Sequence, residues 1–165
     1  MTKILVIAEH NGAVLNPSTA KCVACAAEVG GSDIDVAVLG ASVTEVAAQA
    51  AQINGVSRVL TNERAENDPA VAAILAPQIV AMADGYSHVF GPSTAFGKDL
   101  MPRIAALLGV NQVSDIMSVD GSHSFKRPIY AGNAIVSVEA PQDSVVVATV
   151  RTASYQAAEG GNSAP

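Results

Sequence analysis

The sequence offers three sets of residues that could take part in chemistry: a glycine-bracketed loop, three histidines and two cysteines. The loop, from Gly91 to Lys98, looks like a phosphate-binding loop because it combines glycines, hydroxyl side chains and a lysine. A P-loop, however, has four residues between its first glycine and a Gly-Lys-Ser/Thr triplet. Here five residues separate Gly91 from Gly97, and Asp99 replaces the hydroxyl residue that would hold Mg²⁺. Both differences argue against a nucleotide phosphate at this loop.

A structural role explains the same loop. Gly91 and Pro92 then shape a turn at the end of a strand. Ser93 or Thr94 caps the helix that follows, and Lys98 is solvated. We predict no cofactor for this chain alone. If the loop does contact one, the candidate residues are Ser93, Thr94, Gly97 and Lys98.

The histidines, His10, His88 and His123, fall in different predicted elements. His10 follows the first predicted strand and His88 belongs to the fourth, so we expect both to approach the carboxyl edge of one sheet. A lone histidine is more often a hydrogen-bonded structural residue than a catalyst. The sequence has no Ser-His-Asp spacing, no HExxH motif and no pair of carboxylates that stands out. We therefore predict no catalytic residue and no metal site.

The cysteines, Cys22 and Cys25, form a CxxC pair. A redox dithiol needs its first cysteine at a helix N-terminus, where the thiol pKa is lowered. These two lie well inside a predicted helix rich in alanine, and two thiols cannot complete a four-ligand zinc site. We predict that they are packed as small hydrophobic residues.

Several basic residues are candidates for contacts with a partner in this acidic chain. Arginine suits such contacts because its planar fork pairs with carboxylates across a subunit or domain boundary. Two basic residues lie beside an apolar group that contains Phe125 and Pro128, and interface cores are enriched in arginine and aromatic residues. The alternative is that each charge is simply solvated. The candidate interface residues are Arg103, Lys126, Arg127, Tyr130 and Arg151.

A strand and a helix position the loop from Gly91 to Lys98. His88–Phe90 is a short apolar strand, and a helix with one apolar stripe follows and ends at Gly109. This helix begins either near Asp99, which places Pro102 in its first turn, or near Thr94, with a kink at Pro102. Parallel α/β sheets bind their ligands at such strand–loop–helix junctions.

Strands and helices alternate along the chain up to Met117. Apolar patterns predict strands over Lys3–Ala8, Ile34–Leu39, Val56–Leu60, His88–Phe90 and Gln112–Met117. The first helix begins at Asn16-Pro17 and ends at Gly30-Gly31, and a capping box over Ser42–Glu45 begins the second. The third begins at Asp68-Pro69 and breaks or kinks at Pro77. The alternation predicts a three-layer, doubly wound α/β fold. We expect a fold similar to that of the adenine-nucleotide-hydrolase-like group.

The pattern changes after Asp120. Three further strands are predicted over Phe125–Tyr130, Ala134–Glu139 and Ser144–Arg151, with turns between them, as an antiparallel hairpin or meander appended to the mostly parallel sheet. Pro128 confines its strand to an edge or a bulge. We predict one α/β domain over residues 1–155 and a flexible linker over residues 156–165, where small, polar and glycine residues dominate.

Composition excludes several classes of function. The chain has 165 residues, 50% hydrophobic and only 4% aromatic, which is enough for one core built from Ala, Val, Ile and Leu. Its net charge is −6, without a basic patch, so we expect no nucleic-acid partner. No apolar run is long enough to span a bilayer, and the first strand leaves no room for a signal peptide. We therefore expect a cytoplasmic protein.

Nearly the whole sequence resembles the N-terminal part of the α subunit of electron transfer flavoprotein. The resemblance begins with KILVIAEHNG and continues through FGKDLMPRIAALL, QVSDI, RPIYAGNA and TVR, in the order typical of that family. It implies the N-terminal domain alone, without the second domain that carries most of the FAD contacts in the family. Related flavoproteins of nitrogen fixation and carnitine metabolism share the same α-subunit pattern.

The resemblance also implies a function. In the family, the α subunit pairs with a β subunit, which holds AMP in many members. The heterodimer passes electrons through FAD from flavin dehydrogenases, such as acyl-CoA dehydrogenases, to a membrane quinone reductase. This chain would then be a scaffold and interface domain rather than an enzyme. The alternatives are a free-standing adenine-nucleotide-binding module of the universal-stress-like group and a structural domain that docks through its hairpin.

Overall fold

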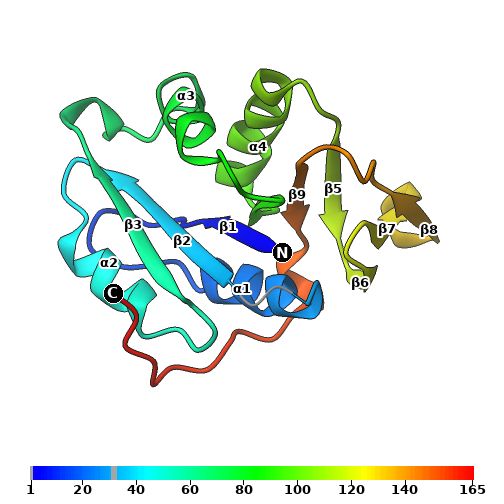
Figure 1. Cartoon of the computed structure of the whole chain (residues 1–165), viewed down its shortest axis with the longest axis horizontal. Coiled ribbons are helices and arrows are strands. Elements are labelled where there is room, and N and C mark those ends of the chain that lie inside the picture. Colours follow the sequence, from blue (N-terminus) through cyan, green and yellow to red (C-terminus); the bar gives the residue numbers. More distant parts are fainter. Residues whose placement is uncertain (1, 31–32) are drawn as a thin grey trace.

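A six-stranded parallel sheet forms the centre of the protein, in the order β3-β2-β1-β4-β9-β5 (Figure 1). The computed structural model describes residues 2–30 and 33–165. The strands of this sheet are β1 (Lys3–Ile7), β2 (Asp33–Gly40), β3 (Arg58–Glu63), β4 (His88–Pro92), β5 (Gln112–Ile116) and β9 (Val146–Val150). The chain winds outward from β1 to β3 on one side and from β4 to β5 on the other, so the sheet is doubly wound, as predicted.

Helices cover both faces of this sheet (Figure 1). On one face lie α1 (Ser18–Glu28) and α2 (Thr44–Ala51), and on the other α3 (Ala72–Met82) and α4 (Ala95–Leu108). Strand β1 shows why two cores form, because its side chains alternate between the faces. Ile4 and Val6 pack toward α1, whereas Leu5 and Ile7 pack toward α3 and α4. The predicted end of α1 at Gly30-Gly31 falls partly outside the described residues, since Gly31 is not among them.

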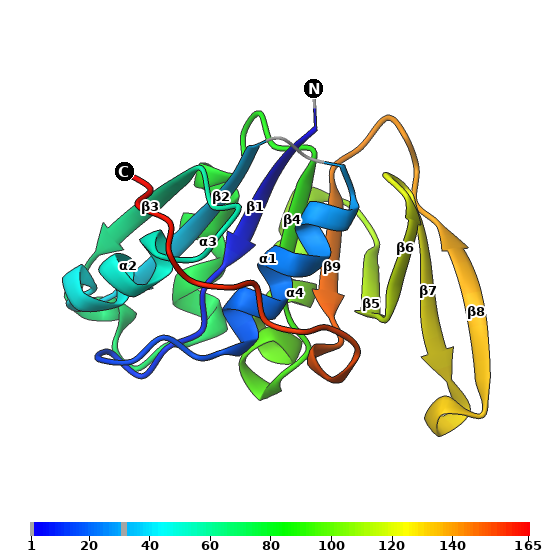
Figure 2. The same cartoon turned by 90° about the horizontal axis from the view of Figure 1, so that it is seen from below.

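A second, antiparallel sheet extends from the edge of the first (Figure 2). It contains β6 (Ser118–Gly121), β7 (Ser124–Ile129) and β8 (Ala134–Glu139) in that order. The prediction that Ser144–Arg151 completes this meander was wrong. The segment forms β9 instead, which lies between β4 and β5 and runs parallel to both. All five residues of β9 are buried, which suits an inner strand of a parallel sheet. Strand β6 was not predicted.

Pro128 of β7 lies where the antiparallel sheet has only two strands, β7 and β8. It pairs with Ile135 of β8, while β6 pairs only with β7 residues up to Lys126. The missing N–H of the proline therefore faces no third strand, in agreement with the predicted edge or bulge position. The turn after it forms a short 3₁₀ segment, η2 (Tyr130–Gly132), and two others are η1 (Ala65–Asn67) and η3 (Thr152–Ser154).

Two predicted helix starts differ from the structure. Ser42 does not cap α2, which begins at Thr44 without a side-chain cap. The Glu63 carboxylate instead accepts a hydrogen bond of 2.7 Å from the Val43 N–H, so a residue distant in sequence replaces the capping box. Helix α3 begins at Ala72, and Asp68-Pro69, joined by a cis peptide bond, lies in the loop before it.

Neither internal proline breaks its helix, so of the two outcomes predicted for Pro77 the break was wrong and the kink stays a prediction. Helix α3 continues through Pro77, and α4 continues through Pro102 from its start at Ala95. Both prolines lie on exposed faces, as do Ala73 and Lys98 four residues before them. Each proline removes one helical hydrogen bond, and water can satisfy the carbonyl that is left free there.

The last ten residues lie across one face of the protein (Figure 2). Ala158 N–H bonds to the Ala20 carbonyl of α1, and Ala164 N–H bonds to the Ala51 carbonyl of α2. The Asn162 side-chain amide donates to the carbonyls of Ile53 and Val56, at 3.1 and 2.7 Å. Whether residues 156–165 act as a linker stays a prediction.

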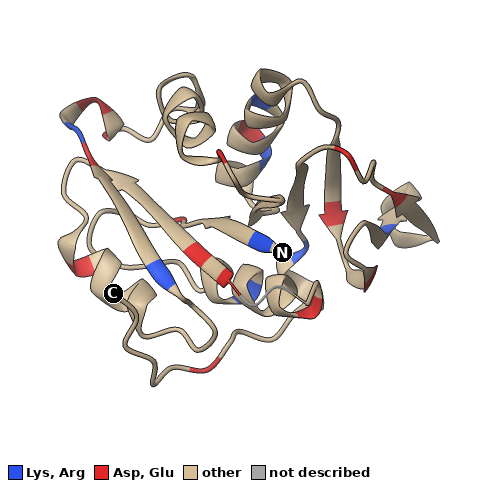
Figure 3. Ribbon diagram, viewed as in Figure 1, with Lys and Arg blue, Asp and Glu red and all other residues tan. Residues whose placement is uncertain are grey.

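An ion cluster around the buried Asp35 joins the amino ends of the first three strands, where Figure 3 shows basic segments on β1 and β3 beside an acidic one on β2. The Asp35 carboxylate accepts hydrogen bonds from Arg58 and from the Tyr86 hydroxyl, with Lys3 at 3.8 Å. Burial by itself would raise the pKa of Asp35. The bonds from Arg58 and Tyr86 and the charges of Arg58 and Lys3 outweigh burial and hold this pKa below its usual range.

Candidate functional site

The crevice between β1 and β4 is the position where a doubly wound sheet usually binds its ligand, because the winding reverses there. In this protein the Glu9 side chain occupies it. One carboxylate oxygen, Oε2, accepts hydrogen bonds from Ser18 Oγ at 2.9 Å and Thr94 Oγ1 at 3.0 Å. Ser18 begins α1 and Thr94 caps α4, so a protein carboxylate lies where two helix N-termini converge. It disfavours a phosphate at the same place through like-charge repulsion.

The glycines beside this crevice serve close packing. A Cβ on Gly97 would lie 1.7 Å from the Pro92 carbonyl oxygen, and one on Gly91 would lie 2.6 Å from Met101 Sδ. Thr94 caps α4 by accepting a bond from Gly97 N–H at 3.3 Å, as the structural interpretation predicted. Lys98 is exposed. Ser93 Oγ is buried and has no hydrogen-bond partner among the described residues.

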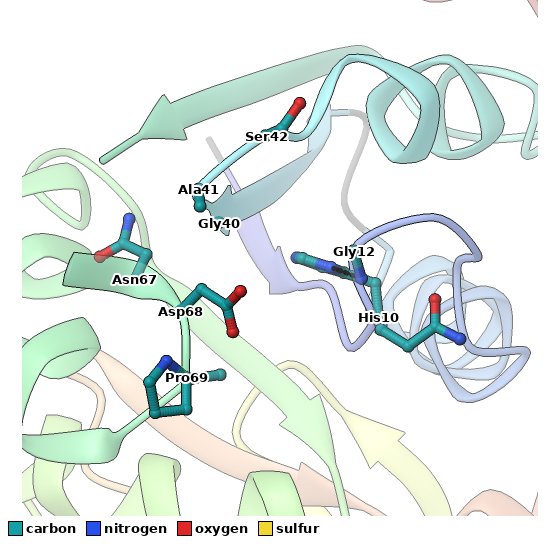
Figure 4. A pocket seen from close by; sticks show the side chains of 10 residues that line it. His10, Gly12, Gly40, Ala41, Ser42, Asn67, Asp68 and Pro69 are labelled. Atoms are coloured by element: carbon teal, nitrogen blue, oxygen red, sulfur yellow. Dashed lines mark hydrogen bonds between the residues drawn. The ribbon is translucent and has the colours of Figure 1, made fainter. Parts of the chain in front are cut away.

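A neighbouring hollow of about 330 Å³ opens at the carboxyl ends of β1 and β2 (Figure 4). His10 and Gly40 form one side, and Asp68 points into it from the loop before α3. His10 Nε2 donates to the Leu39 carbonyl at 2.8 Å, and its Nδ1 accepts from Gly12 N–H at 3.0 Å. Both ring nitrogens are therefore used for structure, which leaves no free imidazole nitrogen for proton transfer in this arrangement.

His88 does not approach the carboxyl edge, contrary to our expectation. It is the first residue of β4 and lies at the amino edge, 1% exposed, with Nε2 2.6 Å from the Ser122 carbonyl. The ring packs 5.5 Å from that of His123, between centroids. Burial lowers the pKa of His88, the nearby His123 lowers it further, and the Ser122 bond opposes both. His88 thus has a structural role in joining the two sheets.

Both cysteines are buried in α1, and each is fully inaccessible to solvent. Burial is the main cause that raises the pKa of Cys25 to about 12, although a Tyr155 contact opposes it, and burial also raises the pKa of Cys22. A thiol that stays protonated is a poor nucleophile and a poor metal ligand. The prediction of packed thiols is confirmed.

Three of the predicted interface residues come together in one place. Arg127, Tyr130 and Arg151 line a hollow of about 480 Å³ with Asp115. Arg127 Nε donates to the Ser114 carbonyl at 2.7 Å, and Arg151 Nη1 lies 3.4 Å from Asp115 Oδ2. This hollow, bounded also by residues 128, 129, 131 and 132, is called the arginine hollow below.

The other two candidates lie elsewhere. Lys126 points away along β7 and pairs with Asp120 of β6 at 3.1 Å. Arg103 is exposed on α4, beside Pro102 and the start of α3. The two key carboxylates, Glu9 and Asp115, were not recognised as site residues, although each lies in a segment that resembles the family, because their contacts with Thr94 and Arg151 are made by residues distant in sequence.

The part of the chain that the structure describes has neither a metal-binding cluster nor a membrane-spanning helix. Residues 2–30 and 33–165 contain no group of three or more His, Cys, Asp or Glu side chains placed to hold a metal ion. Within the same ranges, no helix has the length and apolar character that crossing a membrane requires.

Comparison with known proteins identifies the family. The sequence model of the electron transfer flavoprotein domain matches residues 4–165. The chain is 48% identical over 163 residues to the electron transfer flavoprotein subunit alpha of Pseudomonas aeruginosa and 43% identical over 163 residues to that of Paracoccus denitrificans. Each match covers 98% of this chain and 52% of the relative.

A mitochondrial subunit alpha from Dictyostelium discoideum is 38% identical over 161 residues, which cover 93% of this chain and 45% of the relative. The chain thus spans about half the length of the curated relatives that it matches. The chain belongs to the electron transfer flavoprotein family and corresponds to the N-terminal domain of its α subunit.

Proposed function

We propose that this chain is the scaffold and subunit-interface domain of an electron transfer flavoprotein α subunit. The observation that carries the proposal is the match to subunits alpha over nearly the whole chain. In the complete heterodimer, electrons pass from flavin dehydrogenases, such as acyl-CoA dehydrogenases, through FAD to a membrane quinone reductase. The partner that the domain contacts directly is the β subunit.

The site geometry supports a role without a cofactor of its own. FAD needs an apolar slot for its ring and a cradle for its pyrophosphate. At the switch point of this sheet the Glu9 carboxylate takes the bonds from Ser18 and Thr94 that an anionic group would otherwise receive. We therefore assign FAD mainly to the part of the α subunit that follows this domain, and AMP to the β subunit.

The same geometry disfavours the free-standing adenine-nucleotide module. That alternative depends on the loop from Gly91 to Lys98, whose glycines are required for packing and whose threonine caps α4. It also needs room for phosphate near α4, where Glu9 lies. The match to electron transfer flavoprotein subunits alpha supports a role as part of an electron carrier rather than an enzyme.

The test is assembly. The purified chain is mixed with an electron transfer flavoprotein β subunit, and its mass is measured by light scattering. We expect a one-to-one complex, a colourless preparation of the chain alone, and no saturable heat in calorimetry with ATP or AMP. Tight nucleotide binding by the chain, or an equimolar flavin spectrum, would contradict the proposal, as would the absence of any complex.

A further inference from the structure

The arginine hollow owes its shape to a β-bulge in β5. Pairing between β5 and β9 shifts register between Val113 and Ile116. Asp115 adopts φ 61°, and its N–H donates to the buried Thr149 hydroxyl at 2.8 Å instead of continuing the ladder. A bulge of this kind turns one side chain out of the alternation. Here it directs Asp115 toward Arg151 and exposes the Ser114 carbonyl to Arg127.

The charges in this hollow do not balance. Two guanidinium groups face one carboxylate, which leaves one positive charge in a chain whose net charge is −6. Within residues 2–30 and 33–165, no carboxylate oxygen lies within 4.0 Å of Arg127. Its bond to Ser114 is made by Nε alone. The two terminal nitrogens of Arg127, which can also donate two parallel hydrogen bonds to a carboxylate, remain available for a ligand.

The rim of the hollow suits a protein better than a small ion. Tyr130 is 79% exposed, and Pro128 and Ile129 lie beside it. Tyr130 and Ala131 have φ of 49° and 56°, so all three non-glycine residues with positive φ in the described chain line this one hollow. Such strain is often kept where a surface has a binding role. A volume of about 480 Å³ exceeds what one carboxylate needs and leaves room for neighbouring side chains.

We propose that the arginine hollow binds the carboxylate of an aspartate or glutamate side chain of the β subunit. Arg127 supplies the fork and Arg151 supplies the second charge, while Asp115 pairs with Arg151 in the free domain and competes with the incoming carboxylate for it. A singly charged carboxylate matches the single excess positive charge, whereas a phosphate dianion would leave one negative charge uncompensated and would be repelled about twice as strongly by Asp115. This inference rests on the proposed function, because it names the contact by which the domain binds its partner.

The experiment measures the dissociation constant of the complex between this chain and the β subunit for a series of variants. Arg127→Gln and Arg151→Gln should each weaken binding at least tenfold, as the loss of a charge-assisted bond at an interface does. Arg64→Gln is the matched control, because Arg64 is exposed at the opposite end of the sheet, where it pairs with Glu66. It should change binding less than twofold.

Asp115→Asn gives the decisive result. Asparagine tolerates positive φ and keeps the shape of the bulge, but it removes the charge that competes with the incoming carboxylate. We expect binding to become several-fold tighter. If Asp115→Asn instead weakens binding as much as Arg151→Gln does, the pair is only structural and the inference is wrong. Arg127→Lys, which keeps the charge and loses the fork, should fall between wild type and Arg127→Gln.

Two controls separate the possible failures. Circular dichroism spectra and melting temperatures must match the wild type, and Arg127→Lys replaces Arg127→Gln if the latter unfolds. Acetate should compete with the β subunit better than phosphate at equal ionic strength, and stronger competition by phosphate would overturn the assignment to a carboxylate. If the wild type forms no complex, the proposed function itself fails. If it forms a complex that no substitution in the hollow alters, only this inference fails.

Discussion

Replacing Gly97 by alanine sets two physical effects of opposite sign against each other. Gly97 is the third residue of α4, and alanine stabilises a helix interior by about 1 kcal/mol relative to glycine. A Cβ at this position, however, would lie 1.7 Å from the Pro92 carbonyl oxygen and 2.9 Å from its carbonyl carbon. Even a contact of 3.0 Å would require α4 and β4 to separate by about 1.3 Å.

The contact term dominates, because the obstructing atoms belong to buried backbone. Pro92 is the last residue of β4, which is buried over its whole length between β1 and β9. Overpacking of a core costs about 1–3 kcal/mol where side chains can adjust. Because backbone atoms cannot adjust in this way, we expect a cost at the upper end of that range. Moving α4 also weakens the bond from Gly97 N–H to the Thr94 cap, at about 1 kcal/mol. The net expectation is a loss of about 3 kcal/mol.

Urea unfolding followed by circular dichroism measures this loss of stability. In thermal unfolding, the Gly97→Ala variant of a domain of this size should melt about 6–12 °C below the wild type. Asp99→Ala is the matched control, because Asp99 is exposed in the same helix. This substitution changes the helix propensity but brings no Cβ into contact with β4. It should shift the free energy of unfolding by less than about 0.5 kcal/mol. A Gly97→Ala variant as stable as the wild type would refute the argument that this glycine exists for packing.

Three further predictions follow from the buried groups and the C-terminal segment. Asp35→Asn should cost about 2 kcal/mol at pH 7, since Arg58 and Lys3 remain partly in water, and should flatten the stability curve below about pH 4, measured by urea unfolding. The depressed pKa of Asp35 means that its stabilisation is present above the unfolded value near 3.9 and is lost as pH falls through the folded pKa. Cys22 and Cys25 should react with iodoacetamide at pH 8 only at the rate of unfolding, and fast labelling of the folded chain would contradict their burial. Asn162→Ala should speed proteolysis of residues 157–165 without changing the core melting temperature, since it removes two bonds to backbone carbonyls.

The layer architecture was predictable because it depends on local periodicity. Apolar runs mark β1, β2 and β4, and Gly109 ends α4 in a left-handed conformation at φ 72°. The pairing partners of the strands were not predictable in the same way, because no local sequence pattern determines them. The segment Val146–Val150 is apolar enough for an inner strand and also for an end strand of a meander. Only the contacts with β4 and β5 on both sides decide between the two.

The candidate site was predictable in part for the same reason. Arg127 and Tyr130 are close in sequence, so their grouping could be expected, and Arg151 joins them through the pairing of β9 with β5. Glu9 and Thr94 are 85 residues apart in the sequence, and no motif predicts the hydrogen bond between them. The bulge that turns Asp115 could not be predicted either. A glycine usually indicates a position with positive φ, but here an aspartate adopts that conformation.

The carboxyl edge of this sheet combines two electrostatic environments, which bear on the proposed role as an interface. At the switch point a carboxylate, Glu9, neutralises the positive ends of α1 and α4 and repels phosphate. At the outer end, Arg127 and Arg151 exceed the single charge of Asp115. An anion approaching this edge is therefore attracted to its rim rather than to its centre. The exposed Tyr130 makes the rim accessible to another polypeptide, whereas at the centre Glu9 already takes the bonds of Ser18 and Thr94, so the charge distribution favours the proposed partner protein over a small anionic ligand.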